Sequence, residues 1–335
     1  MQGFCIYCQR IKQTKSMSHQ THLPLQFFCK QIIDTFQQAI ANPDPAAFLY
    51  RKDARTPLFM AESLTRALLE INHTAKDEKA LKLFKKLEDT LGEIEDYDDM
   101  AKQFEKNKAI KKEEVNYFAK KRDKAIEKLN GKLIRKEFYQ AEFKKITNGI
   151  IANFNDKDIV HELQNHIKRE LDLSFKCYRE FKNGFTDMET QVHEIRRKLR
   201  WVSIYGKSFN GTIVLEKKKT NYAWEKKFIA EKSKEDPYNT LPVNKNLSHF
   251  IVFDQKAFYA LNSIVDSLGE IKDKGLAIEF LAKSIRKTNG LEKKESKALA
   301  LKHLKVKYTE TGLLNEAHAL LKAFFDTYGI HKLII

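Results

Sequence analysis

The chain has 335 residues, of which 42% are hydrophobic, and its 61 lysines and arginines outnumber its 45 aspartates and glutamates to give a formal charge of +16 at pH 7. Four cysteines are too few for a disulfide-stabilised scaffold of this length, and no apolar run reaches the ~18 residues that span a bilayer. The charge excess indicates an anionic partner, such as a phosphate polymer or an anionic membrane surface.

Residues 1–22 are expected to form an irregular, basic N-terminal extension. They contain no continuous apolar stretch followed by a cleavage site, so we expect a cytoplasmic protein without a secretory signal. Cys5-x-x-Cys8 followed by His19-x-x-His22 suggests a zinc site, but the intervals are short for a zinc finger. We interpret these residues as part of a tail with ordinary thiols, and we expect neither a metal nor a cofactor.

The remaining residues have the composition of a helical protein. Only 12 glycines and 6 prolines occur in the whole chain, and apolar residues recur at helical spacing. The stretches 76–150 and 255–330 carry no strand signal. The predicted fold class is therefore all-α, with about eight to ten helices.

A short repeat divides this helical region in two. Residues 89–96 read Asp-Thr-Leu-Gly-Glu-Ile-Glu-Asp, and residues 266–273 read Asp-Ser-Leu-Gly-Glu-Ile-Lys-Asp. Helical patterns precede and follow each copy, which favours an internal duplication over a chance match. We expect two pseudo-symmetric helical units, 23–150 and 151–335, with a boundary in 148–158 where Gly, Asn and Asp interrupt the pattern.

Cations follow one face of the long helix expected after the first copy. On a helical projection they fall within about 80° of one another, in the set Lys121, Lys124, Lys128, Lys132 and Arg135. The corresponding helix of the second half carries a similar set, Lys294, Lys297, Lys302 and Lys305. Each face alone fits plain solvated surface as well as an anion-binding surface, and its occurrence in both halves favours binding.

The stretch 190–210 combines an apolar face with a narrow cationic stripe. Ile195, Leu199 and Val202 occupy one side of the predicted helix, and the stripe on the other side spans about 100° and contains His193, Arg196, Arg197, Arg200 and Lys207. We expect no compensating acid on the stripe, so a bound anion would relieve its like-charge repulsion. The alternative is an exposed face that forms salt bridges with a neighbouring helix. The preceding helix adds Arg179, Lys182, Lys168 and Lys176.

Residues 210–246 are expected to form a long loop inserted into the second unit. Pro237, Pro242 and a mixed periodicity interrupt the helical pattern here. The loop leaves room for one short helix.

These elements together resemble the CHAD family, the conserved histidine α-helical domain. The basic helix of that family is similar to His193-Glu-Ile-Arg196-Arg197-Lys-Leu-Arg200, and its Leu-Gly-x-x-Arg-Asp-x-Asp motif is similar to Leu91-Gly92-Glu-Ile-Glu95-Asp96-Tyr-Asp98 and Leu268-Gly269-Glu-Ile-Lys272-Asp273. The resemblance implies two pseudo-symmetric four-helix bundle units over about residues 25–335. It also implies cationic helices that face a shared surface and inorganic polyphosphate as the ligand.

The chain departs from the family pattern at several positions. Glu95 and Lys272 stand where the motif has arginine. When the apolar residues of the first half are aligned with those of the arginine helix, Arg66 is the only cation retained, opposite Arg197. The first unit is therefore expected to keep little of the cationic helix.

The expected function is non-enzymatic binding of inorganic polyphosphate or another phosphate-rich polyanion, with strong salt dependence. Nucleic-acid binding by the same helices is an alternative, with Trp201, Tyr205, Tyr222 and Trp224 as stacking groups. A phosphohydrolase is a second alternative, although the chain contains no phosphate loop, Gly-x-Ser-x-Gly or His-Glu-x-x-His motif. We expect no catalytic residue, and we interpret the acidic stretch 93–99 as a helix start instead of a magnesium site.

Overall fold

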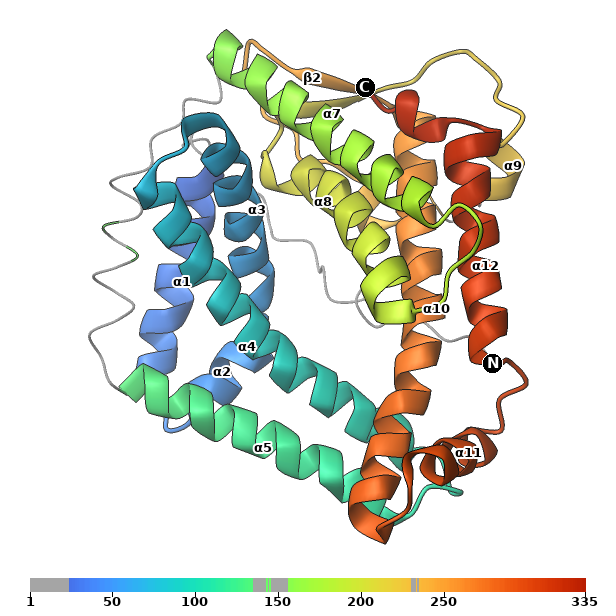
Figure 1. Cartoon of the computed structure of the whole chain (residues 1–335). Coiled ribbons are helices and arrows are strands. Elements are labelled where there is room, and N and C mark those ends of the chain that lie inside the picture. Colours follow the sequence, from blue (N-terminus) through green and yellow to red (C-terminus); the bar gives the residue numbers. More distant parts are fainter. Residues whose placement is uncertain (1–23, 135–142, 144, 146–155, 230–232, 234) are drawn as a thin grey trace.

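The computed structural model describes residues 24–134, 143, 145, 156–229, 233 and 235–335 (Figure 1). Within these residues the protein is mostly α-helical, which confirms the predicted helical character. No helix in the described part of the chain is long and apolar enough to cross a membrane. The extension 1–22, with its Cys and His residues, and most of the predicted boundary lie outside the described residues.

The described helices of the first half are α1 (Pro24–Ile40), α2 (Pro45–Arg51), α3 (Arg55–Asn72), α4 (Ala75–Glu105) and α5 (Lys112–Ile134). The link between α3 and α4 shows how local sequence sets the helix ends. His73 adopts a left-handed conformation (φ 51°) after α3, and the Thr74 side chain accepts a hydrogen bond from the Asp77 amide at the start of α4. α4 carries the first copy of the repeat in its middle.

The second half contains α7 (Lys157–Glu180), α8 (Glu194–Ser208), α10 (Gln255–Asn289), α11 (Lys293–Leu304) and α12 (Glu310–Lys322). A π-helical turn, Met188–His193, leads directly into α8, and a second, Ala323–Thr327, follows α12. Such turns are rare and are often found near functional sites. α10 carries the second copy of the repeat and ends at Gly290, whose φ of 69° suits a residue without a side chain.

Two short strands correct the prediction of an all-α fold. β1 (Ile213–Glu216) and β2 (Ile251–Asp254) pair in parallel, with Ile213 opposite Ile251. α9 (Glu225–Phe228) lies between them, so the predicted loop 210–246 contains regular structure. The strands escaped prediction because each has only four residues and its partner is far along the chain.

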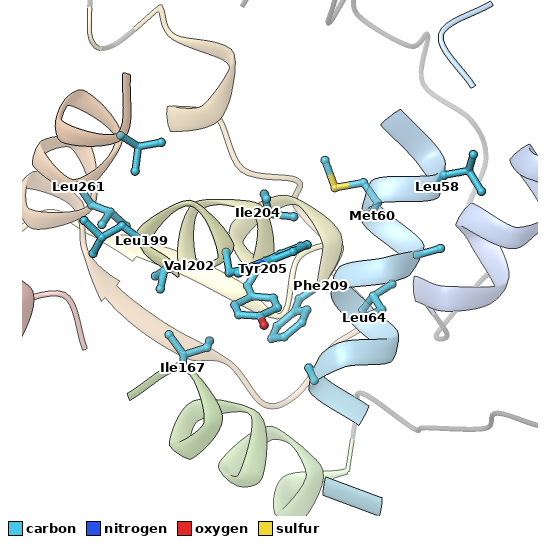
Figure 2. Packing of buried hydrophobic residues seen from close by; sticks show 14 of the residues in the cluster. Leu58, Met60, Leu64, Ile167, Leu199, Val202, Ile204, Tyr205, Phe209 and Leu261 are labelled. Atoms are coloured by element: carbon cyan, nitrogen blue, oxygen red, sulfur yellow. The ribbon is translucent and has the colours of Figure 1, made fainter. Parts of the chain in front are cut away.

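The main hydrophobic core contains side chains from both halves of the chain. In Figure 2, Met60 and Leu64 lie on the side of α3 that faces α8, while Ile167 of α7 and Leu261 of α10 lie on other sides of α8. α8 is thus surrounded by α3, α7 and α10, and its apolar face is buried as the sequence pattern predicted.

A second, smaller core joins the far ends of the long helices. Phe104 of α4 and Phe118 of α5 pack with Ile278 and Leu281 of α10 and with Ala300 of α11. The rings of Phe104 and Phe118 lie 5.2 Å apart between centroids. These ends meet where α5, α10 and α11 converge in Figure 1. The two halves of the chain are therefore in contact in both cores, through α3 with α7 and α8 in the main core and through α5 with α10 in the smaller one.

Candidate anion-binding surfaces

The cationic stripe of α8 makes contacts within the protein. Arg196 Nε donates a hydrogen bond to the Val265 carbonyl oxygen at 2.9 Å. The Arg200 guanidinium lies over the ring of Phe59 in α3, 4.6 Å from its centroid. Lys207 Nζ donates to the Thr240 carbonyl oxygen, and burial lowers the pKa of Lys207 although Asp236 opposes the shift. These three side chains connect α8 to α10, to α3 and to the inserted segment.

The other two residues of the stripe, Arg197 and His193, also differ from the uncompensated cations that the sequence predicted. Arg197 is exposed, and its Nη2 lies 2.9 Å from Glu194 Oε2, which corrects the expectation that no acid compensates the stripe. His193 ends the π-helical turn and is half-buried, and its Nδ1 has no hydrogen-bond partner among the described residues. Burial lowers the pKa of His193, with a further lowering by Lys272 and Arg196 against Glu189. Burial therefore favours the neutral form of the His193 imidazole.

Each copy of the repeat places its glycine under an arginine. A Cβ atom on Gly269 would lie 2.8 Å from Arg196 Nη2, and one on Gly92 would lie 2.8 Å from Arg55 Nη2. The first-half counterpart of Arg196 in this contact is thus Arg55, a residue that the sequence alignment missed. Arg55 lies in the first turn of α3, before the apolar pattern on which that alignment rested.

Arg66, which that alignment paired with Arg197, has a different environment. Its guanidinium lies 4.5 Å from the ring centroid of Trp201 and 3.7 Å from the carboxylate of Glu62. Burial raises the pKa of Glu62 to about 7, and Glu88 adds to this rise while Arg66 opposes it. Arg66 therefore packs in the contact between α3 and α8.

Arg55 and Arg196, the two arginines that cover the repeat glycines, have neighbours of different charge. Arg55 Nε lies 2.6 Å from Glu88 Oε1, and Arg55 Nη1 lies 2.7 Å from Glu95 Oε2. In the second copy the residue equivalent to Glu95 is Lys272, which pairs with Asp273 at 3.2 Å. The two copies of the repeat therefore carry charges of both signs.

The two copies of the repeat also lie close to one another. Burial raises the pKa of Asp96, Arg55 and Lys272 lower it, and Glu95 and Asp273 raise it. These electrostatic effects join residues of the first copy with residues of the second copy. The fold thus brings together two segments that are far apart in the chain.

The lysine face of α5 remains accessible in the folded protein. Lys124 and Lys128 are exposed, and Lys121 Nζ lies 5.7 Å from the ring centroid of Tyr117. Burial lowers the pKa of Lys132, and Lys128 and Lys86 lower it further against Glu93. Among the described residues, none of the four α5 lysines forms an ion pair with a carboxylate. The fifth predicted cation, Arg135, lies outside the described residues.

The predicted cations of α7 and α11 are mostly exposed as well. In and after α7 these are Lys168, Lys176, Arg179 and Lys182, and none has a carboxylate partner in the described part of the chain. In and after α11, Lys294, Lys302 and Lys305 are likewise exposed, whereas Lys297 pairs with Glu310 at 2.5 Å. α5 and α11 meet at the smaller core, while α7 lies beside α8 at the other end (Figure 1).

The aromatic residues proposed as base-stacking groups belong to the core. Trp201, Tyr205 and Trp224 are buried, and Tyr222 stacks on Trp224 with 4.8 Å between ring centroids. Tyr205 Oη also lies 2.9 Å from His166 Nε2. Tyr222 is half-buried, and Lys256 Nζ lies 5.9 Å from its ring centroid.

In the part of the chain that the structure describes, no group of three or more His, Cys, Asp or Glu side chains is placed to hold a metal ion. No protein-family model, no curated protein and no solved structure matches this chain.

Proposed function

We propose that the protein binds an extended polyanion, inorganic polyphosphate or a polymer of similar charge density, through the lysine face of α5. The observation that carries the proposal is the row Lys121, Lys124, Lys128 and Lys132, which has no carboxylate partner among the described residues. Lys86 of α4 adds a further nearby charge. Because these cations disfavour one another, a bound anion would stabilise them and release counterions.

Further cations extend the proposed surface. α11 packs at the same end of the molecule as α5 and contributes Lys294 and Lys302. A flexible polymer could contact both helices, and its affinity would then come from many weak contacts. We propose the cations of α7 as a second, separate contact surface.

We also infer that the chain is a diverged duplication and a distant member of the CHAD family. Two observations support this inference. The repeated Leu-Gly-Glu-Ile segments each lie within a long helix, α4 or α10, and each glycine packs against an arginine from the first turns of another helix, Arg55 or Arg196. A two-fold superposition of two such units should place these two contacts on one another.

Phosphate recognition is favoured over base recognition. The four aromatic residues expected to stack on bases pack in or against the main core, and Tyr117 beside Lys121 is half-buried, so nucleic acid would bind mainly through its backbone. Polyphosphate consists only of such a backbone. The proposal is one of binding without catalysis, because the sequence contains no phosphate loop and no Gly-x-Ser-x-Gly or His-Glu-x-x-His motif.

A charge-removal experiment tests the site. Lys124→Gln with Lys128→Gln should weaken binding to long-chain polyphosphate by about tenfold, because two phosphate contacts are lost from a multivalent set. The slope of log affinity against log salt should become shallower by about two. RNA and double-stranded DNA at the same salt concentration provide the comparison ligands.

A matched control removes the same charge elsewhere. Lys82 and Lys85 are exposed on α4 but pair with Glu78 and Asp89. Lys82→Gln with Lys85→Gln should leave the affinity within about twofold of that of the unmodified protein. Equal losses in both double variants would show that only net charge matters and would refute the α5 site.

A further inference from the structure

Exposed apolar side chains gather in one short segment of the second half. Of the four large hydrophobic side chains that are exposed among the described residues, three are Val243, Phe250 and Val252, with exposed fractions of 85%, 41% and 45%. The fourth, Leu173, lies on α7. This concentration at residues 243–252 sets the segment apart from the rest of the described surface.

The two-stranded sheet holds these side chains together. Ile251 and Phe253 of β2 are buried in the core, so Val252 points to the opposite, outer face. Phe250 precedes the strand by one residue and is also exposed. Val252 lies opposite the half-buried Val214 of β1. The outer face of the sheet therefore carries Val214 and Val252, and the exposed Glu216 at the end of β1 is an acidic residue on this face.

Val243 lies at the beginning of the same sheet. Its neighbour Asn244 packs on Gly211, where a Cβ atom would come within 2.6 Å of the Asn244 amide nitrogen. Gly211 lies two residues before β1, and the Ile251 amide donates to the Thr212 carbonyl oxygen at 2.8 Å. Val243, Phe250 and Val252 are the three exposed members of what we call the outer sheet patch.

Lysines flank the outer sheet patch at both of its ends. Lys217 and Lys219 follow β1, and Lys245 follows Asn244 at the start of the sheet. All three are exposed, and none forms an ion pair with a carboxylate of the described residues. Lys218 lies within 3.7 Å of Asp254 at the end of β2, which places the residues after β1 beside the end of β2.

We propose that the outer sheet patch docks the protein on an anionic lipid bilayer. Phe250, Val243 and Val252 would enter the boundary between headgroups and acyl chains, while the flanking lysines contact lipid phosphates. A protein partner fits less well, because three side chains provide far less than the ~1,000 Å² that a specific protein interface buries. This inference is independent of the polyanion site on α5.

The strand that carries Val252 is anchored firmly in the protein. The inner side chains of β2 are fixed in the main core, and the Asp254 amide donates to the Ile334 carbonyl oxygen at 2.9 Å. The patch is therefore presented on a supported strand. No ordering of the chain is needed before it meets a surface, so little conformational entropy is lost on binding.

Vesicle flotation tests the proposal. The protein should float with vesicles of phosphatidylcholine and phosphatidylserine, and much less with vesicles of phosphatidylcholine alone. Phe250→Ser with Val252→Thr should reduce binding to the anionic vesicles by about tenfold, since two apolar side chains no longer enter the bilayer. Val252→Thr keeps a β-branched side chain in the strand. Leu173→Gln removes a similarly exposed apolar side chain outside the patch and should have no effect.

Further variants separate the alternatives. Lys217→Gln, Lys219→Gln and Lys245→Gln together should reduce binding to the anionic vesicles, and Val243→Ser, in an exposed segment, should weaken it without any cost to the fold. Polyphosphate affinity should not change in the apolar variants. The proposal is wrong if the unmodified protein ignores anionic vesicles or if the Phe250 and Val252 changes leave binding intact. It is equally wrong if the protein self-associates in sedimentation experiments and these changes abolish the association.

Discussion

At the scale of single residues, Gly92 and Gly269 explain why a repeated glycine lies in the middle of a long helix. Glycine weakens a helix interior by roughly 0.5–1 kcal/mol relative to alanine. Here the missing side chain leaves space for a guanidinium group, Arg55 over Gly92 and Arg196 over Gly269. The contact that the arginine makes with a second helix offsets this loss of helix stability.

This contact gives a prediction for Gly269→Ala. The added Cβ atom would lie 2.8 Å from Arg196 Nη2 and 3.1 Å from Arg196 Nε. The guanidinium must move, and its hydrogen bond to the Val265 carbonyl oxygen weakens. We expect the free energy of unfolding in urea to fall by about 1–3 kcal/mol.

Gly275→Ala in the same helix is the matched control. The nearest atom to its Cβ would be Met188 Cγ at 3.8 Å, an ordinary contact. This change should stabilise the protein by up to about 1 kcal/mol through helix propensity. A Gly269→Ala variant that is as stable as Gly275→Ala would show that the guanidinium contact has no energetic weight.

At the scale of elements, α7 packs through two buried histidine contacts. His166 of α7 lies against Tyr205 of α8, and Phe175 of α7 stacks on His331 of the C-terminal segment with 4.7 Å between ring centroids. Burial lowers the pKa of both histidines to about 4. The packing of this helix therefore depends on two neutral imidazole rings.

The stability of the protein should therefore fall in acid. Below pH 6.5 the unfolded histidines bind protons, whereas the folded ones stay neutral until the pH approaches 4. Each histidine thus lowers the free energy of unfolding by about 1.4 kcal/mol per pH unit over this interval, and has no such effect above it. Glu62, whose pKa is raised, acts in the opposite direction between about pH 4.5 and 7.

Substitution isolates the effect of one histidine. His331→Phe keeps an aromatic ring beside Phe175 and Phe325 but cannot be protonated. Between pH 6.5 and 5 the variant should lose about 2 kcal/mol less stability than the unmodified protein, measured by urea unfolding at each pH. Because Glu62 is present in both proteins, its contribution cancels. Parallel pH dependences would exclude a neutral, buried His331.

At the scale of the whole molecule, the two halves of the chain meet in two separate cores. The main core surrounds α8, and the smaller core joins the ends of α4 and α5 to α10 and α11. Ser284 Oγ donates to the Glu114 carbonyl oxygen at 2.7 Å across this second contact. The smaller core holds the first turns of α5, whereas the part of α5 that carries the lysine face buries Ala125, Leu129 and Leu133 in the main core.

We expect the smaller core to unfold locally while the main core stays folded. Phe118→Ala removes a fully buried ring that packs against Phe104 and Phe280, at an expected cost of about 3–5 kcal/mol. Hydrogen exchange should then be faster in α11 and in the first turns of α5, while α8 keeps its protection. Uniform loss of protection in α5, α8 and α11 would instead show a single cooperative unit. Leu173→Ala, at an exposed position, should change neither region.

The sequence by itself determined the helical character and the cationic faces of α5, α7 and α11, but not that α4 is one continuous helix, because the predicted helix start at 93–99 lies inside it. Apolar spacing is a local property, and a helix that buries one face leaves the other to solvent, so such features can be predicted without knowledge of the neighbours. The buried face of α8 follows from the same rule. The strands β1 and β2 cannot be predicted from local spacing, because the pairing of Ile213 with Ile251 joins residues that are far apart in the chain.

Only the tertiary structure decided which cations remain accessible. Arg196 and Arg200 lie on the predicted stripe, yet one donates to the Val265 carbonyl oxygen and the other lies on Phe59. Helical periodicity gives the direction of a side chain but not the atoms that another element places in front of it. The contact of Arg55 with Gly92 is of the same kind. Such contacts arise where segments distant in the chain pack together, and a pattern read along one segment carries no information about its neighbours in space.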